Sequence, residues 1–157
     1  MREVPKTEGL SKVRGSKNDR KALAAHWVER ANGRLLEARL MMRRGWGRAA
    51  VPSAYFAIHA AMRALLRLKG VNLKNPRRAF SSFNNHYVRP DLFPQALMVE
   101  AETVGKIREL ADYYELAPIP KAQARYAVTA AARFVAAVEK FIKNNEPVKR
   151  KGSGKTK

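Results

Sequence analysis

The clearest pattern of apolar and polar positions lies between residues 49 and 70. Apolar side chains recur there at steps of three and four, which predicts a buried stripe along an α-helix. The stripe consists of Val51, Ala54, Tyr55, Ile58, Ala61, Met62, Leu65 and Leu68. A second stripe of small side chains would let another helix approach closely; it consists of Ser53, Ala57, Ala60 and Ala64. A helix that is apolar on two faces is expected to lie in the middle of a bundle.

Helical periodicity recurs in four further segments, which are separated by breaks that contain glycine or proline. They span residues 18–44, a short segment from residue 76, residues 91–114 and residues 121–143. Gly45 suits the end of the first helix, and Asp91 is placed to cap the helix that follows it. Runs of β-branched residues are scarce. The sequence therefore predicts an all-α fold, an up-and-down bundle of four long helices plus one short helix.

The two ends of the chain differ in composition from the helical part. Residues 1–17 and 144–157 are polar and basic, with too few apolar side chains to bury. We therefore predict flexible basic tails on either side of one helical domain at residues 18–143. A chain of 157 residues is expected to form a single domain.

Charge is the strongest feature of the composition. The formal net charge is +19, from 32 basic and 13 acidic residues, and residues 22–142 alone keep +10. A field of this sign attracts polyanions such as nucleic acids. The other interpretation is a basic protein in which the charge has no specific partner.

Several site classes find little support in the sequence. There is no cysteine, which excludes disulfides and thiolate metal sites and is compatible with the cytoplasm. The three histidines are isolated from paired acids, so we expect no metal site and no cofactor. No secretory signal and no run of 18 uncharged apolar residues occurs, so we expect a cytoplasmic protein without membrane contact.

Basic side chains on two predicted helices are candidate nucleic-acid contacts. One set shares the outer side of the last helix, where a solvated face is the alternative: Arg125, Arg133 and Lys140. The other set is His59 with Arg63, one turn apart on the helix at 49–70. A lone histidine on a mostly apolar helix is more often a hydrogen-bonded core residue than a functional one. The aromatic residues look scattered in sequence rather than interleaved with basic ones, which argues against a stacking platform. Those considered are Trp27, Trp46, Tyr55 and Tyr87.

Three motifs occur in order along the chain: AYFAIHAAMRALL at residues 54–66, SFNNHYV at 82–88 and RELADYY at 108–114. Together they resemble the HEPN superfamily, in its branch of small stand-alone bacterial and archaeal proteins with an Arg-x-x-Ala-Asp-Tyr signature. The resemblance implies the same helical bundle. It also implies a homodimer, to which the small-residue stripe lends support, and a nucleotidyltransferase partner in a toxin–antitoxin or defence-type module.

The resemblance also indicates where catalysis would lie. HEPN ribonucleases carry an arginine, a spacer of four to six residues and a histidine. The matching position here is Arg108, but Asp112 and Tyr113 follow and no histidine is within reach. The i,i+4 spacing lets Arg108 pair with Asp112, so the two residues are either a structural ion pair or, with Tyr113, part of a phosphate-facing cleft.

Three functions follow from these observations. The first is binding of RNA or nucleotide, with catalysis left open because the ribonuclease histidine is absent. The second is a protein-interaction subunit that docks a nucleotidyltransferase. The third is an active, metal-independent ribonuclease built on Arg108, Asp112 and Tyr113.

Overall fold

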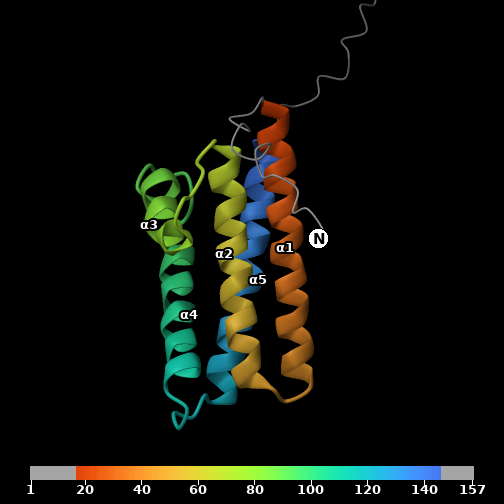
Figure 1. Ribbon diagram of the computed structural model, residues 1–157, viewed down its shortest axis with the longest axis vertical. Coiled ribbons are helices and arrows are strands. Elements are labelled where there is room, and N and C mark those ends of the chain that lie inside the picture. Colours follow the sequence, from red (N-terminus) through yellow and green to blue (C-terminus); the bar gives the residue numbers. More distant parts are fainter. Residues whose placement is uncertain (1–16, 146–157) are drawn as a thin grey trace, which may run out of the picture.

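The computed structural model describes residues 17–145, so the predicted tails at 1–17 and 144–157 lie almost entirely outside the described residues. Four long helices run side by side (Figure 1): α1 (Lys17–Arg43), α2 (Gly47–Leu68), α4 (Gln95–Tyr113) and α5 (Lys121–Asn144). A short helical segment joins α2 to α4 and consists of η2 (Pro76–Arg78), α3 (Ala79–Phe83) and η3 (Asn84–Val88). Residues 17–145 contain no strand, which confirms the predicted all-α bundle.

Helix α2 is the centre of the bundle, as its two-faced pattern predicts. It packs against α1, α3, α4 and α5, and Figure 1 shows it between α1 and α4 with α5 behind. By length and composition α2 could span a membrane, but 67% of its most apolar window is buried among the other helices. The apolar character of α2 is therefore explained by its place in the core.

The small-residue stripe of α2 is buried inside the bundle. Ser53, Ala57, Ala60 and Ala64 are all at most 7% exposed. The hydroxyl of Ser53 contacts the sulfur of Met41 on α1 at 3.8 Å, which places the stripe against that helix. The stripe therefore lends no support to the homodimer, because the close approach that small residues allow is used by α1; the homodimer itself stays a prediction.

Helix ends follow the glycine pattern at two positions and depart from the prediction at a third. Gly45 and Gly70 have φ values of 76° and 82°, which L-residues with a Cβ rarely adopt. Asp91 also has a positive φ, of 61°, and α4 starts only at Gln95, after Pro94. The prediction that Asp91 caps α4 was therefore wrong; it lies in the preceding turn.

Aromatic packing holds the short segment against the bundle. Phe83 is fully buried, stacks on Tyr87 and contacts Phe93 and Phe134 at ring-centroid distances of 5.0 and 5.5 Å. The hydroxyl of Tyr87 donates to the backbone carbonyl of Leu65 on α2. Burial raises the pKa of the Tyr87 hydroxyl, so this group stays a donor. The wall that α3 and η3 form beside α2 is consequently fixed by core contacts.

One arginine holds the connection between α4 and α5. The Arg48 guanidinium donates to the carbonyls of Ala111 at 3.1 Å, Ala117 at 2.7 Å and Tyr114 at 2.5 Å, with Leu110 at 3.5 Å. The last carbonyls of a helix have no partner within the helix, and a cation there also matches the helix dipole. Arg48 therefore stabilises the C-terminal end of α4, one turn beyond Arg108.

Candidate functional site

The Arg108 guanidinium lies over two aromatic side chains of α2. Its guanidinium carbon is 4.4 Å from the ring centre of Tyr55 and 4.9 Å from that of Phe56. The Nε–H group donates to a carboxylate oxygen of Asp112 at 3.0 Å, so the ion pair predicted from the i,i+4 spacing is present. The side chains of Arg108 and Asp112 remain 29% and 33% exposed. The pair with Asp112 uses the Nε–H group of the guanidinium.

A second group of arginines and aromatics continues from this contact onto α1. The guanidinium carbons of Arg63 and Arg30 lie 4.0 and 4.8 Å from the ring centre of Trp27, and that of Arg34 lies 5.6 Å from Phe56. The prediction that Trp27 and Tyr55 are scattered was therefore wrong, because three helices bring them together with basic residues. We call this surface the arginine–aromatic face: Trp27, Arg30, Arg34, Tyr55, Phe56, His59, Arg63 and Arg108.

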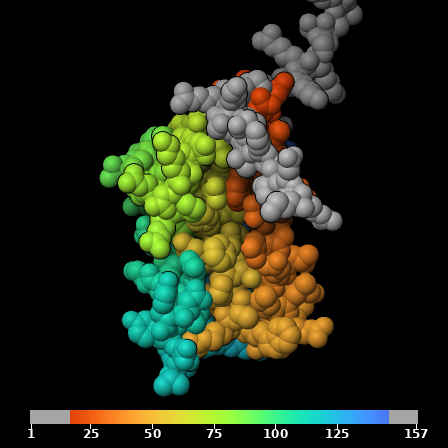
Figure 2. All heavy atoms as spheres, viewed as in Figure 1, coloured from red at the N-terminus to blue at the C-terminus, as the bar shows by residue number. Residues whose placement is uncertain are grey.

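The arginine–aromatic face lies on the side of α2 that α5 leaves uncovered. Figure 2 shows atoms of α2 exposed in a hollow between α1 on one side and α3 and α4 on the other. Burial lowers the pKa of Arg63, and the charges of Arg67 and Arg30 add to the effect. Because Arg67 and Arg30 place further positive charge near Arg63, a bound anion would relieve their mutual repulsion.

His59 is fixed at the edge of this face. Its Nε2 atom lies 3.0 Å from the backbone carbonyl of Pro76, and since a carbonyl only accepts, Nε2 carries the hydrogen. Burial lowers the pKa of His59 most, and the charges of Arg63 and Arg108 lower it further, so the ring is neutral at pH 7. The prediction of a hydrogen-bonded histidine is confirmed, and its Nδ1 atom keeps a lone pair.

Tyr113 stands apart from the pair that precedes it. Its side chain is 75% exposed, and it has no hydrogen bond or ring contact with Arg108 or Asp112. The structure thus joins two of the three predicted catalytic residues and leaves the third at the outer surface of α4. The positive charge of Arg108 is one of the causes that lower the pKa of His59 on α2.

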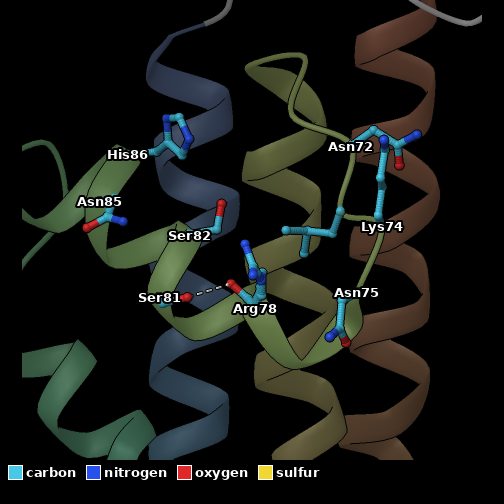
Figure 3. Close-up of a pocket in the computed structure, with 9 residues that line it drawn as sticks. Asn72, Lys74, Asn75, Arg78, Ser81, Ser82, Asn85 and His86 are labelled. Carbon is cyan, nitrogen blue, oxygen red and sulfur yellow. Dashed lines mark hydrogen bonds between the residues drawn. The ribbon is translucent and has the colours of Figure 1, made fainter.

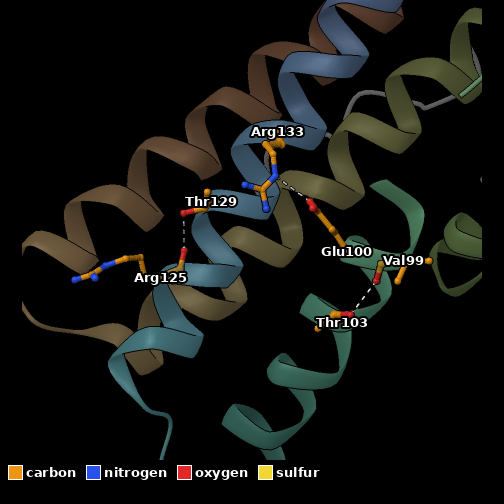
Figure 4. A network of polar contacts seen from close by, with 6 residues as sticks. All are labelled: Val99, Glu100, Thr103, Arg125, Thr129 and Arg133. Carbon is orange, nitrogen blue, oxygen red and sulfur yellow. Dashed lines mark hydrogen bonds and ion pairs between the residues drawn. The ribbon is translucent and has the colours of Figure 1, made fainter. Parts of the chain in front are cut away.

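The predicted contacts on α5 belong to a different surface. Arg133 pairs with Glu100 of α4 at 3.1 Å, and the Thr129 hydroxyl donates to the carbonyl of Arg125 (Figure 4). Arg125 lines an open groove with other basic residues of α1 and α5, namely Arg39, Arg43 and Lys121. Lys140 is exposed further along the helix. Because the inner side of α5 packs on α2, these residues point away from His59 and Arg63.

Metal chemistry has no candidate site among residues 17–145. No group of three or more histidine, aspartate or glutamate side chains is close enough there to hold an ion. The chemistry available on the arginine–aromatic face is therefore that of guanidinium groups, aromatic rings and one neutral imidazole.

The sequence of this helical bundle matches a known protein family. The HEPN domain family model matches residues 24–141, which include all four long helices almost entirely. The chain belongs to the HEPN family. A UPF0332 protein of Thermotoga maritima is 24% identical over 127 residues, which cover 81% of this chain and 96% of that protein. The family match confirms the resemblance drawn from the three motifs.

Within this HEPN domain, sequence reasoning missed three members of the face. Trp27, Arg30 and Arg34 lie on α1, more than 70 positions before Arg108. Their steps of three and four put them on one side of a helix, which was a usable signal. What the sequence alone does not give is that this side of α1 turns toward Phe56 and Arg63.

Proposed function

We propose that this HEPN protein binds RNA or nucleotide phosphates on its arginine–aromatic face, as a cytoplasmic member of a toxin–antitoxin or defence-type module. The observation that carries the proposal is the contact of Arg108 with Tyr55 and Phe56, continued by Arg63 and Arg30 on Trp27. Arg34 brings the number of guanidinium groups on this face to four. They are spread over the exposed side of α1, α2 and α4 beside His59.

Stacking on aromatic rings orients a guanidinium for phosphate. The ring covers one flat face of the group, while the N–H edges stay available for two parallel hydrogen bonds to phosphate oxygens. Phe56 is itself 38% exposed, so a nucleic-acid base can stack on it. Only Arg108 and Arg34 of this set are paired with carboxylates, on Asp112 and Glu37. Arg30 and Arg63 supply positive charge without an acidic partner among the described residues.

Binding receives more support than cleavage. A metal-independent ribonuclease needs a group that takes the proton of the 2′-hydroxyl and a second group that donates a proton to the leaving 5′-oxygen. The Nδ1 atom of His59 can accept a proton, but Tyr113 is not placed beside Arg108 to act as its counterpart. We therefore keep catalysis outside the proposal.

The test is binding of a fluorescent single-stranded RNA to the full chain, measured by anisotropy at several salt concentrations. Wild-type affinity should fall steeply as salt rises, because phosphate contacts release counterions. The double variant Arg63→Gln with Arg108→Gln should weaken binding at least about tenfold, since hydrogen bonds to charged groups are worth ~1.5–3 kcal/mol each.

The matched control removes the same charge elsewhere. Arg43 and Arg44 are exposed at the end of α1 and do not belong to the face, so Arg43→Gln with Arg44→Gln should weaken RNA binding less than about threefold. Equal losses in the two double variants would mean that only overall charge matters, and absence of binding by the wild type at low salt would overturn the proposal.

A second candidate function is favoured by exposed apolar side chains at the far end of α4. Tyr113, Tyr114 and Leu116 are 75%, 61% and 98% exposed, and Leu110 is 39% exposed. Contiguous apolar side chains at a surface are typical of protein–protein contacts. This surface would receive a nucleotidyltransferase partner or a second copy of the chain, and it leaves the arginine–aromatic face free for RNA.

A further inference from the structure

A groove of about 420 Å³, the α1–α5 groove, lies along the contact between these two helices. Figure 4 shows Arg125 directed away from α4, whereas Arg133, further along α5, reaches Glu100 of that helix. Each helix contributes a pair of cations to the groove: Arg39 and Arg43 on α1, and Lys121 and Arg125 on α5. The members of each pair are four positions apart, so they lie one turn apart on the same side of their helix. The groove therefore has a basic wall on each helix.

The floor of the groove is apolar. Met42 and Val128 line it, one from each helix. Val128 is 8% exposed and Met42 is half-buried, whereas the cations of the two walls are exposed. Leu36 extends the apolar surface, because it lies one turn before Arg39 on the same side of α1 and is 58% exposed. An apolar floor between charged rims is the composition of a protein–protein contact.

The positive charge of the α1–α5 groove is not neutralised within the chain. The four cationic side chains have no hydrogen bond or ion pair anywhere between residues 17 and 145. Two acidic neighbours have other partners: Glu37 pairs with Arg34 at 3.1 Å, and Glu139 accepts a hydrogen bond from Asn32 at 2.6 Å. Carboxylates of a partner would therefore relieve the repulsion between the two walls and would find their donors free.

The lining favours a protein segment over a nucleic acid. Among the described residues that line the groove none is aromatic, so bases would have no ring on which to stack, in contrast to Phe56 on the arginine–aromatic face. The one hydroxyl of the lining, that of Thr129, already donates to a carbonyl of its own helix. Arginine and methionine, which this lining does contain, are enriched at protein–protein interfaces.

The geometry of the two walls suits a helical partner. Arg43 at the end of α1 and Lys121 at the start of α5 both line the groove, so the two helices run antiparallel along it. A third helix can pack into such a groove with an apolar stripe toward Met42 and Val128. The residues on either flank of that stripe then face the two basic walls. Carboxylates four positions apart on each flank would match the one-turn spacing of the cations.

We propose that the α1–α5 groove docks an acidic amphipathic helix of a partner protein. The apolar side chains of that helix would pack on Met42 and Val128, and its carboxylates would pair with the cations of the two walls. The groove shares no residue with the arginine–aromatic face or with the exposed apolar end of α4. The inference therefore does not depend on the proposed RNA binding, and RNA would not compete with the partner helix.

The probe for this site is a synthetic fluorescent peptide of about 18 residues, or about five helical turns. It carries leucine at steps of three and four, with glutamate on both flanks of the leucine stripe. A second peptide has the same composition in scrambled order. Anisotropy with the full chain should show the amphipathic peptide binding at least about tenfold more tightly than the scrambled one, because only the first presents leucines and glutamates on separate faces.

Charge reversal in the groove should abolish this preference. Arg39→Glu with Arg125→Glu should weaken binding of the amphipathic peptide at least about tenfold, since like charges then face each other. The matched control makes the same charge change in a second hollow, of about 600 Å³, which lies beside α3 and is lined by Lys74 and Arg78 (Figure 3). Lys74→Glu with Arg78→Glu should weaken binding less than about threefold, because only the general attraction is reduced. Circular dichroism checks that both variants fold.

Three results with the peptides would overturn the proposal: no binding at low salt, equal binding of the scrambled peptide, or equal losses in the two double variants. Two further results would assign the groove to another occupant and overturn it as well. Single-stranded RNA binding that falls more in Arg39→Glu with Arg125→Glu than in the control would assign the groove to RNA. A dimer of the wild-type chain that this variant dissociates would assign it to a second copy.

Failure of this site and failure of the proposed RNA-binding face are distinguishable. Arg63→Gln with Arg108→Gln removes charge from the arginine–aromatic face and leaves the groove intact, so this double variant should bind the amphipathic peptide within about threefold of the wild type.

Discussion

Arg108 contacts its surroundings in two ways that differ in strength. The pair with Asp112 is partly exposed, and i,i+4 pairs of this kind contribute only ~0.3–0.5 kcal/mol. Each aromatic contact of an exposed cation is worth ~0.5–1 kcal/mol, and Arg108 has two, with Tyr55 and Phe56. The structural role of this arginine therefore lies more in its aromatic contacts than in the ion pair that the sequence predicted.

The first prediction follows from this comparison. Arg108→Ala should lower the free energy of unfolding by about 1–2 kcal/mol, whereas Asp112→Asn should lower it by less than about 0.5 kcal/mol. RNA affinity should fall in the first variant and not in the second, because only the first removes a group that donates hydrogen bonds to phosphate. Urea denaturation and RNA titration of both variants and of their combination give the coupling energy. A coupling above ~1.5 kcal/mol in stability would show that the ion pair dominates.

His59 gives a prediction about pH. Its pKa is lowered in the folded protein, chiefly by burial. The unfolded chain, with the usual value near 6.5, therefore binds more protons than the folded chain at mildly acidic pH. The stability that depends on neutral His59 is fully present above pH ~6.5 and is lost as pH falls toward the folded pKa.

Substitution removes this dependence. His59→Gln should cost about 1 kcal/mol at pH 7.5 for the lost bond to Pro76, and the difference from the wild type should shrink as pH is lowered to 5. Denaturation curves at the two pH values check it, with His26→Gln as the control because His26 is exposed. A difference that stays constant with pH would contradict the assignment.

At the scale of the elements, Arg48 sets how α4 ends. Arg48→Ala leaves the part-buried carbonyls of Ala111 and Ala117 without their donor, which should cost about 1–3 kcal/mol. Arg48→Lys should restore only part of this, because an ammonium lacks the planar fork that reaches several carbonyls. Hydrogen exchange should accelerate at residues 110–117 in both variants, and Arg44→Ala, in the turn between α1 and α2, should leave it unchanged.

The long helices could be predicted to within a few residues because their periodicity is a local property of the sequence. The start of α4 could not be predicted, because the chain enters a left-handed conformation at Asp91 and α4 begins only after Pro94. The division of the short segment into three kinds of helical turn depends on Phe83 and Tyr87 packing on distant aromatics. No local pattern contains that information.

The candidate site divides along the same line. Arg108 with Asp112 could be predicted because both lie one turn apart on a single helix. The contacts of Arg63 with Trp27 and of Arg108 with Tyr55 each join two helices, so they depend on how the bundle packs. The polar pocket that residues between 72 and 86 line beside α3 could not be predicted, because these residues show no periodic spacing.

At the scale of the whole molecule, the expectation of a homodimer now rests on the exposed apolar end of α4 and on the family resemblance. Light scattering on the full chain at micromolar concentration should give about twice the monomer mass of 17.7 kDa. Tyr113→Ser with Leu110→Ser should shift the mass toward the monomer, since each buried side chain of this size contributes ~1.5–3 kcal/mol. Leu36→Ser is the matched control, because Leu36 is 58% exposed on the opposite side of α1 from Arg34. A monomer in the wild type would contradict the prediction.

The close packing of α1 on α2 also bears on how the chain folds. Only residues 44–46 separate the two helices, so closing this hairpin costs little chain entropy. Helix α5 contacts both of them but lies more than 70 positions from α2 at most points, which makes its docking slower. We therefore expect the α1–α2 hairpin to form first, during synthesis, and to wait with one side of its central helix exposed until α5 leaves the ribosome. That interval is when an unfinished chain is most exposed to aggregation and to chaperones.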